Sequence, residues 1–390
     1  MNLKSLQYYD ELYICAYCAY CVNNEASCPT YHSVLHEIVT GRGKIITARN
    51  LAEGLIDSEE GFDALRDGLF QCTFCGACQE NCIVDIPLTK VYSELKTLVQ
   101  DRLPRNTRKM FEDLDKEHNI YGLDQEDREN WSFEIEDQYN EWVNLHHEIG
   151  FFLGCVYSYS GRAGRGPVAI LKLAKMANEK ISIFSPSEYC CGNPYLLGGQ
   201  KDKAEEFADH NVSEIKRLGI KKLIISCAGC YRVFTEEYPQ LLGKELPFKV
   251  ISHMEYLVTL IKEKKLIFQN KSPVKVTYKD PCELGRHCGV YDVARDLLAN
   301  LPGVDNREMA SHKEKALCCG SGGLIKTNHP VIANEIAIRL ISQMEEQNVD
   351  LCVNACPSCL LNIDENLRIE ASQIKSIDIA ELVLNRTKDS

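Results

Sequence analysis

Cysteine is the residue with which this chain is best equipped to do chemistry. The sequence has 20 cysteines in 390 residues, and such a number points to disulfides, metal binding or redox chemistry. A chain of this length can bury hydrophobic cores without disulfide staples, and its first residues, MNLKSLQYYDELY, lack the apolar run of a secretory signal. We therefore expect a reducing, cytoplasmic setting in which the thiols bind metal.

The cysteines near the N-terminus form two groups with the spacing of iron–sulfur ligands. The groups are Cys72, Cys75, Cys78 and Cys82, and Cys15, Cys18, Cys21 and Cys28. The first has the spacing C-x2-C-x2-C-x3-C, in which three thiolates hold one cubane 4Fe-4S cluster and the fourth serves a second cluster. The other repeats the triplet but has six residues before Cys28, which Pro29 follows.

Exchanging the fourth ligands between the groups predicts two adjacent clusters. One falls on Cys15, Cys18, Cys21 and Cys82, and the other on Cys72, Cys75, Cys78 and Cys28. Zinc also accepts four thiolates, but its sites seldom use three ligands as closely spaced as a C-x2-C-x2-C triplet. Two neighbouring clusters would form a path for single electrons.

The cysteines beyond residue 150 repeat with a nearly constant offset. Cys155 recurs as Cys282, Cys190-Cys191 as Cys318-Cys319, and the pair Cys227 and Cys230 as Cys356 and Cys359, at offsets of 127, 128 and 129 residues. This regularity indicates that 150–390 contains two copies of one unit. Each copy supplies five thiolates, one too many for a zinc ion, and adjacent cysteines suit a cofactor with several irons better than a single ion.

Each copy is expected to be an α/β unit. Short β-rich runs lead into cysteines at 148–155, 221–227, 273–282 and 350–356, and the segments 167–180 and 329–347 have apolar residues at helical spacing. Strands that alternate with helices form parallel sheets, and ligands gather at the carboxyl ends of such strands. We predict an α+β multidomain fold, with an N-terminal helical two-cluster ferredoxin-like domain followed by two tandem α/β cysteine-rich (CCG) units.

The absence of cysteine between 83 and 154 marks a boundary. We divide the chain into a ferredoxin-type domain (1–100), an acidic connector (101–149), a first CCG domain (150–265) and a second CCG domain (266–390). The connector holds both tryptophans, Trp131 and Trp142, and shows little period-2 alternation. We therefore expect it to be helical or irregular.

Glycines accompany the adjacent cysteine pairs. They are Gly192, Gly198 and Gly199 in the first copy, and Gly320, Gly322 and Gly323 in the second. Glycine lets backbone N–H groups approach sulfur closely and hydrogen-bond to it. We assign Gly192 and Gly320 to cofactor binding, while tight turns are the alternative, above all for Gly198 and Gly199.

The overall composition excludes some partners. The chain is 45% hydrophobic and 26% charged, with a net charge of −12. This field repels nucleic acid and anionic lipid surfaces. No apolar stretch approaches the roughly 20 residues that cross a bilayer, so we expect no direct membrane span and any peripheral membrane contact to be made through a partner subunit.

These motifs resemble one family, the CCG-domain iron–sulfur proteins, and within it the family of heterodisulfide reductase D-type subunits, whose chains are equivalent to fused C and B subunits. The resemblance covers nearly the whole chain. Besides the two ferredoxin motifs, it lies in FLGC (152–155), YCCGN (189–193), CAGC (227–230), DPCELGRH (280–287), CCGSGG (318–323) and CPSC (356–359). In this family each complete CCG motif holds a noncubane 4Fe-4S cluster, and a disulfide is cleaved between the two.

By this resemblance, ten cysteines would be both ligands and catalytic residues. The first noncubane cluster falls on Cys155, Cys190, Cys191, Cys227 and Cys230, and the second on Cys282, Cys318, Cys319, Cys356 and Cys359. The chain would be the catalytic subunit of a heterodisulfide reductase, reducing the coenzyme M–coenzyme B disulfide to two thiols. Its electrons would come from a partner subunit: a cytochrome b, a flavoprotein or a ferredoxin.

The alternative is a homologous electron-transfer subunit of a larger redox complex serving acyl-CoA, lactate, sulfur or aromatic metabolism, with no disulfide activity of its own. Relatives that only relay electrons often have one degraded CCG motif. Both motifs are complete here, which favours the enzyme.

Five charged residues are further candidates. Glu283 stands where many relatives have histidine, so a proton donor or substrate contact would differ. His287 is close to a cluster cysteine in sequence and could supply protons, but an exposed or helix-capping histidine is the simpler interpretation. Arg162, Arg165 and Lys326 are candidates for contact with an anionic substrate, although solvated surface positions are the simpler interpretation for the two arginines.

Two cysteines, Cys288 and Cys352, lie outside the ten-ligand pattern. Neither has a counterpart at the repeat offset. We predict that both are buried thiols.

Overall fold

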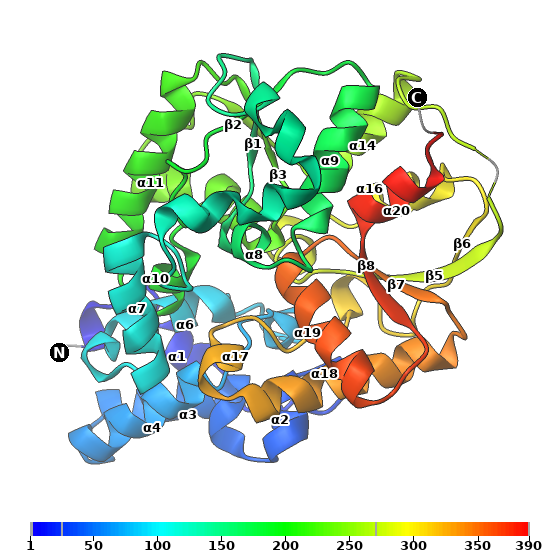
Figure 1. Cartoon of the computed structure of the whole chain (residues 1–390). Coiled ribbons are helices and arrows are strands. Elements are labelled where there is room, and N and C mark those ends of the chain that lie inside the picture. The colour runs from blue at the N-terminus through cyan, green and yellow to red at the C-terminus, as the bar shows by residue number, and fades with distance from the viewer. Residues whose placement is uncertain (1–2, 25, 270, 389–390) are drawn as a thin grey trace.

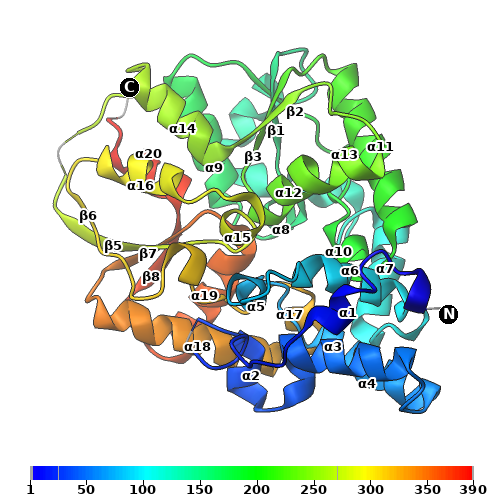
Figure 2. The ribbon, with the colours of Figure 1, turned by 180° about the vertical axis from the view of Figure 1, so that it is seen from behind.

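Two α/β units stand side by side on a helical N-terminal segment. The computed structural model describes residues 3–24, 26–269 and 271–388. Figures 1 and 2 show the first unit in green, the second in yellow to red, and the N-terminal helices in blue below both. No helix within these ranges is long and apolar enough to cross a membrane.

The N-terminal segment consists of short helices around two cysteine loops. Its helices are η1 (Leu3–Ser5), α1 (Glu11–Ile14), α2 (Pro29–Val34), η2 (Glu37–Val39), α3 (Gly41–Ala52), α4 (Ser58–Phe70), α5 (Ala77–Glu80), α6 (Leu88–Thr97) and η3 (Gln100–Arg102). The Asp57 carboxylate caps α4 by accepting hydrogen bonds from the amides of Glu59 and Glu60. Buried apolar residues of α4 and α6, such as Leu69 and Leu95, form the core between the helices.

The connector is helical and packs against the first unit. It contains α7 (Arg105–Glu117) and the 3-10 segment η4 (Gln125–Glu141), which is interrupted at Ile135. Trp131 and Trp142 are buried in the first unit's core. The backbone of 142–144 also hydrogen-bonds to Ile183. The later part of the connector therefore packs into the first unit, while α7 also reaches the second unit, where Asn106 donates to the Thr327 carbonyl at 2.8 Å.

The first unit is a parallel four-stranded sheet with helices on both faces. Its strands are β1 (Ile149–Phe152), β2 (Ile181–Ile183), β3 (Lys222–Ile225) and β4 (Lys249–Ser252), in the order β2-β1-β3-β4. Its helices are α8 (Cys155–Tyr159), α9 (Arg165–Met176), α10 (Asn193–Leu197), α11 (Lys201–Arg217), α12 (Ala228–Arg232), the π-helix η5 (Val233–Glu237), α13 (Tyr238–Leu241) and α14 (His253–Lys262). Phe151 lies opposite Ile183 of β2 and Ile224 of β3.

The second unit repeats this topology. Its strands are β5 (Val274–Lys279), β6 (Val304–Asn306), β7 (Leu351–Asn354) and β8 (Lys375–Asp378), in the order β6-β5-β7-β8, all parallel. Its helices are α15 (Gly285–Cys288), α16 (Asp292–Ala299), η6 (Lys313–Lys315), α17 (Ile325–Asn328), α18 (Pro330–Glu346), α19 (Pro357–Ile369) and α20 (Ile379–Arg386). The equal strand order confirms the predicted tandem α/β arrangement.

One hydrophobic core runs through both units. Helix α9 packs against α20, and α14 packs against α16 and α20. Buried residues of both units, including Ile170, Leu257, Leu297 and Leu382, belong to the same cluster. The two sheets are thereby held with the carboxyl ends of their strands near a common centre, below which the N-terminal helices lie (Figure 1).

Candidate iron–sulfur centres and the cavity between the units

The exchanged ligand set of the first N-terminal cluster lines a single small cavity. Cys15, Cys18, Cys21 and Cys82 lie around it together with Cys78. Cys18 is exposed, while the other three predicted ligands are half-buried. We call this place the outer centre.

The second predicted set also lines one cavity, deeper in the molecule. Its members are Cys28, Cys72, Cys75 and Cys78. Cys28 and Cys75 are buried, and burial raises the pKa of the Cys28 thiol to about 12. The buried Lys44 lies close by, with its ammonium 5.0 Å from the centre of the Tyr92 ring. We call this place the inner centre.

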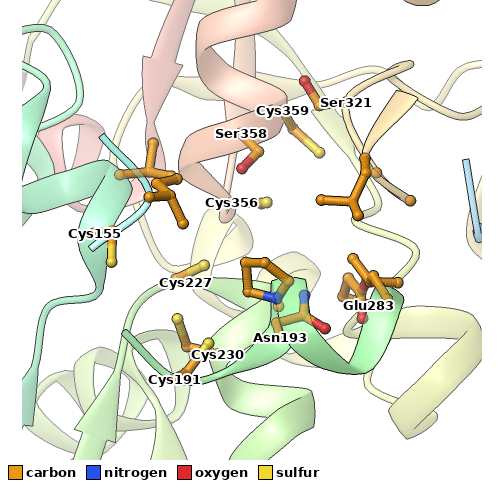
Figure 3. Close-up of a pocket in the computed structure, with 18 of the residues that line it drawn as sticks. Cys155, Cys191, Asn193, Cys227, Cys230, Glu283, Ser321, Cys356, Ser358 and Cys359 are labelled. Atoms are coloured by element: carbon orange, nitrogen blue, oxygen red, sulfur yellow. The ribbon is translucent and has the colours of Figure 1, made fainter. Parts of the chain in front are cut away.

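Nine of the ten CCG cysteines line one cavity of about 180 Å³ between the two units. They are Cys155, Cys190, Cys191, Cys227, Cys230, Cys282, Cys319, Cys356 and Cys359. Figure 3 shows Cys227 and Cys356, equivalent residues of the two units, pointing into the cavity. The tenth, Cys318, instead contacts Cys75 of the inner centre. We call the space between the units the central cavity.

Strand ends and glycine turns position these cysteines. Cys155, Cys227, Cys282 and Cys356 each follow the carboxyl end of a strand within three residues. Each adjacent cysteine pair is followed by a glycine, Gly192 or Gly320. Their φ values of 83° and 86° are readily adopted only by glycine. The amide of Gly320 donates to the Cys318 sulfur at 3.3 Å, the kind of contact expected from the sequence.

The sulfur atoms within each unit are close enough to hydrogen-bond to one another. In the first unit, the Cys190 and Cys230 thiols lower the pKa of Cys191 to about 6. In the second, Cys318 contacts Cys282 and Cys319, and Cys319 contacts Cys359. Each unit thus gathers thiols from three separate loops.

A buried arginine from the connector contacts the first group of thiols. Arg128 is 1% exposed, and its guanidinium lies 3.7 Å from the Cys155 sulfur and 2.9 Å from Glu188 Oε1. Glu188, itself fully buried, also accepts hydrogen bonds from the amides of Leu153 and Gly154. Burial raises the pKa of the Glu188 carboxyl, and Arg128 and the two amides oppose this effect. Sequence reasoning missed this pair, because Arg128 lies far from any cysteine motif.

The second group has a buried lysine instead. Lys279, the last residue of β5, is 1% exposed, and its ammonium donates to the Asp280 carbonyl at 2.6 Å. Burial opposes its charge, but the thiolates of Cys359, Cys319 and Cys282 raise its pKa. The sequence could have indicated this residue, because a lysine at the end of a predicted buried strand is unusual. The two thiol groups therefore have different cationic neighbours.

The inner centre lies against the second unit. The Cys318 thiol hydrogen-bonds to Cys75 and holds the pKa of Cys75 well below its usual range. Arg286 Nε donates to the Cys75 carbonyl at 2.5 Å, and His287 Nε2 lies 2.9 Å from the Phe74 carbonyl. A Cβ on Gly323 would lie 2.0 Å from the Cys72 carbonyl oxygen. Gly323 thus permits close backbone packing between the ferredoxin-like segment and the second unit.

Polar contacts link the two units at two places. At the first, Arg232 contacts Glu283 and Glu237 and donates to Asn193 at 2.7 Å. At the second, the Tyr157 hydroxyl donates to Asp378 at 2.6 Å. Nearby, Arg162 is 2.8 Å from Glu381.

Four of the five charged sequence candidates lie outside the central cavity. His287 packs against Phe74, Arg162 pairs with Glu381, and Lys326 contacts Asn334 and Glu365. Arg165 is exposed, 3.9 Å from Glu134. Glu283 alone among the five charged candidates lines the cavity.

One of the two additional thiols differs from expectation. Cys352 is fully buried in β7, as predicted. Cys288 is only half-buried, because it ends the short helix α15 and lies 3.9 Å from the Thr235 hydroxyl.

The donor set suits iron–sulfur clusters better than single ions. Within 3–24, 26–269 and 271–388, no three His, Cys, Asp or Glu side chains converge closely enough to hold one metal ion. The cysteines instead surround cavities, as ligands to a multi-iron cofactor would. Thiolates are soft ligands that favour such clusters.

Comparison with known families defines the class of protein. Residues 11–86 match the model of the 4Fe-4S dicluster domain, and residues 149–235 and 276–364 each match that of the cysteine-rich domain CCG. The chain is therefore an iron–sulfur protein with one dicluster domain and two CCG units.

Curated relatives define the family more narrowly. The chain is 33% identical to the D-type subunit of dihydromethanophenazine:CoB–CoM heterodisulfide reductase from Methanosarcina barkeri, over 98% of this chain and 95% of that one. It belongs to the family of heterodisulfide reductase D-type subunits and is an oxidoreductase of the heterodisulfide reductase type.

With more distant relatives, the match to this chain covers a smaller part of the relative's length. The EtfAB:quinone oxidoreductase of Syntrophomonas wolfei is 29% identical over 81% of this chain and 46% of that protein. Among solved structures, a hypothetical protein from Helicobacter pylori matches with a TM-score of 0.56 at 9% identity, covering 90% of this chain and 68% of that one. The latter likeness concerns the fold alone.

Proposed function

We propose that this chain reduces a disulfide of two small thiols in the central cavity. The observation that supports the proposal is the cavity lining, to which both CCG units contribute their cysteines. The two noncubane 4Fe-4S clusters would be held by Cys155, Cys190, Cys191, Cys227 and Cys230, and by Cys282, Cys318, Cys319, Cys356 and Cys359. Clusters bound there would supply single electrons and iron atoms with affinity for sulfur.

The stoichiometry of the reaction explains why two such sites face one space. Cleaving one disulfide to two thiols consumes two electrons and two protons. The chain's own part is to place the two sulfurs between its thiol groups. Met110, Ile120, Val156 and Leu197 form an apolar part of the cavity wall.

In this proposal, electrons move from the outer centre, which is partly exposed, to the inner centre, which is more deeply buried. Electrons from a partner subunit enter at the outer centre, where Cys18 is exposed, and pass to the inner centre, where Cys28 and Cys75 are buried. From there the contact between Cys75 and Cys318 leads into the second unit. The relatives' names, which describe subunits of redox complexes, support a partner of this kind, and a cytochrome b, a flavoprotein and a ferredoxin are the candidates.

The relative from Methanosarcina barkeri acts, by its name, on the disulfide of CoB and CoM, and the coenzyme M–coenzyme B disulfide is the substrate predicted from the family resemblance. Anaerobic iron and sulfide quantification, combined with EPR of the oxidised protein with and without thiols, tests the proposal. We expect about sixteen irons per chain and a thiol-dependent paramagnetic signal. About eight irons without a thiol response would leave only the ferredoxin-type clusters and favour an electron relay.

A further inference from the structure

The two units differ at one buried position beside their thiol groups. Phe152 is the last residue of β1, and Lys279 is the last residue of β5. They are 127 residues apart, the offset that also separates Cys155 from Cys282, and each lies opposite the last residue of the next strand in its sheet. The repeat therefore places a phenyl ring in the first unit where the second unit has an ammonium.

Lys279 is buried without a carboxylate partner. It is 1% exposed, and its ammonium donates to the Asp280 carbonyl at 2.6 Å. The Asp280 carboxylate is paired with Arg295, and no other carboxylate in the described part of the chain forms an ion pair with Lys279. Phe152, in contrast, is fully buried among aromatic rings, 6.0 Å from Phe184 and 4.8 Å from Phe234 between ring centroids.

The anions that face Lys279 are the sulfurs of the second thiol group. Cys282, Cys319 and Cys359 come from three separate loops, and each interacts electrostatically with the ammonium. Burial lowers the pKa of Lys279, but these sulfurs raise it above its ordinary value. A buried charge needs a compensating charge close by, and the thiolates provide it. The second thiol group therefore has a positive charge beside it.

The cation beside the first thiol group is already neutralised by a carboxylate. Arg128 lies 3.7 Å from the Cys155 sulfur, but its guanidinium is also 2.9 Å from the buried Glu188 carboxylate. At the offset of 128 residues that relates the adjacent cysteine pairs, the second unit has Ala316 in place of Glu188. The first thiol group thus faces a neutral ion pair, whereas the second faces an uncompensated cation.

The other charges nearby do not reverse this difference. Glu283 acts on one cysteine of each thiol group and is paired with Arg232, so it does not favour either group. Arg286 faces Cys282 and Cys318 of the second group. It therefore adds positive charge on the same side as Lys279.

From this difference, we infer that Lys279 makes the second unit the first of the two CCG units to accept an electron, by raising the reduction potential of the cluster held there. Positive charge beside an iron–sulfur cluster stabilises its reduced, more negative state. The second unit is also the one that contacts the inner centre, through Cys318 and Cys75. In the transfer, the inner centre loses one electron and the second unit gains it, no bond is broken and no proton moves, and the one-electron donor of the partner subunit replaces the electron. The inference rests on the proposed function, which places one cluster in each unit.

An anaerobic redox titration of the holoprotein, followed by EPR, tests the inference. Lys279→Met removes the charge, and the equivalent Phe152 shows that the fold accommodates an apolar side chain at this position. We expect the earlier-reduced of the two CCG signals to shift. Its ratio of reduced to oxidised form at a given potential should fall about tenfold, which corresponds to about 59 mV for one electron.

Lys275→Met is the matched control. Lys275 is half-buried near the start of the same strand, at the end away from the cysteines. The control variant should leave both midpoint potentials unchanged.

Glu188→Gln is the reciprocal variant. It removes the negative charge of the first unit's ion pair but keeps an oxygen that can accept from the amides of Leu153 and Gly154. The signal that Lys279→Met leaves unchanged should now have a ratio of reduced to oxidised form about tenfold higher at a given potential. The two CCG signals would then titrate closer together.

The outcomes are distinct. A Lys279→Met protein with about sixteen irons and unchanged potentials, or one in which the later-reduced signal shifts, would overturn the inference and leave the proposed function standing. Loss of the second unit's irons in this variant would assign the lysine to assembly of the site and would overturn the inference as well. About eight irons in the wild type, with no signal beyond those of the ferredoxin-type clusters, would overturn the proposed function and the inference with it.

Discussion

Single buried cations lie beside each thiol group of the central cavity. The two thiol groups of the central cavity have different cationic neighbours, Arg128 from the connector and Lys279 from β5. Arg128 matters for a second reason, because it is the cationic partner of the fully buried Glu188. Removing one member of a buried ion pair leaves the other unpaired in a medium of low dielectric constant.

We therefore expect Arg128→Met to lower the free energy of unfolding by about 3–5 kcal/mol. Arg165→Met is the control, because Arg165 is exposed and 3.9 Å from Glu134, and such surface pairs contribute about 1 kcal/mol at most. Anaerobic guanidinium unfolding of both variants measures the difference. Equal losses in the two variants would show that the buried pair has no special role.

The turn at Gly323 lets a loop of the second unit pack closely against the ferredoxin-like segment. Gly323 has a φ of 64°, and an added Cβ would collide with the Cys72 carbonyl. Gly243 has a similar φ of 61° but open space around it. The two glycines therefore separate backbone strain from interdomain packing.

We expect Gly323→Ala to displace the inner centre from the second unit and to slow reduction of the CCG clusters by an external donor. Gly243→Ala should cost only the strain of a left-handed alanine, about 1–2 kcal/mol, and leave that rate unchanged. Freeze-quench EPR after mixing with a reductant measures the rate. A normal rate in Gly323→Ala, with full iron content, would argue against electron transfer through this contact.

The start of α20 carries a buried carboxyl group that makes stability depend on pH. Asp378 is 1% exposed, and burial raises its pKa to about 6 from an ordinary value of 3.8. The Tyr157 hydroxyl, the Ala380 amide and Arg162 oppose this rise, while Glu381 faces the same site. The folded state therefore binds the proton more tightly than the unfolded state, and this group's contribution to stability falls as pH rises through the window from about 4 to 6.

Asp378→Asn removes that dependence while retaining an oxygen acceptor for the helix cap. Relative to the variant, the wild type should lose about 2 kcal/mol of unfolding free energy between about pH 4 and pH 6. Anaerobic urea unfolding at several pH values gives the difference curve. A flat or rising curve would mean that Asp378 is ionised at an ordinary pKa in the folded protein.

The sequence predicted the elements that end in cysteines and missed several of the others. The β-rich runs before Cys155, Cys227, Cys282 and Cys356 are strands β1, β3, β5 and β7. The last residues of each strand are buried, as in parallel sheets that helices cover on both faces. The short edge strands β2 and β6 have only three residues each. So few residues show no clear alternation of apolar and polar side chains, so the sequence did not predict these strands. Arg128 was also beyond reach, because its contact with Cys155 depends on how the connector folds back.

At the scale of the whole molecule, the proposed function requires the two units to keep a fixed spacing, because both would act on one disulfide. Arg232 contributes by linking the first unit to Glu283 of the second. Its side chain is 5% exposed, so its removal leaves two carboxylates unpaired.

We expect Arg232→Met to weaken the thiol-dependent EPR signal while leaving the iron content near the wild-type value. Combining it with Glu283→Gln should restore part of the stability, because the unpaired charge is removed. Iron analysis, EPR and anaerobic unfolding of the two single variants and the double variant complete a double-mutant cycle. Strict additivity of the unfolding free energies would show that the two side chains do not act as a pair.

The exposure of Cys18 has a further consequence. In the proposed function, the exposure that would let a partner approach the outer centre would also admit dioxygen to it, whereas Cys28 and Cys75 of the inner centre are buried. We expect air to destroy the outermost cluster first. Brief exposure would then disconnect the enzyme from its electron supply before damaging the place where sulfur is handled, and rebuilding one surface cluster would restore it.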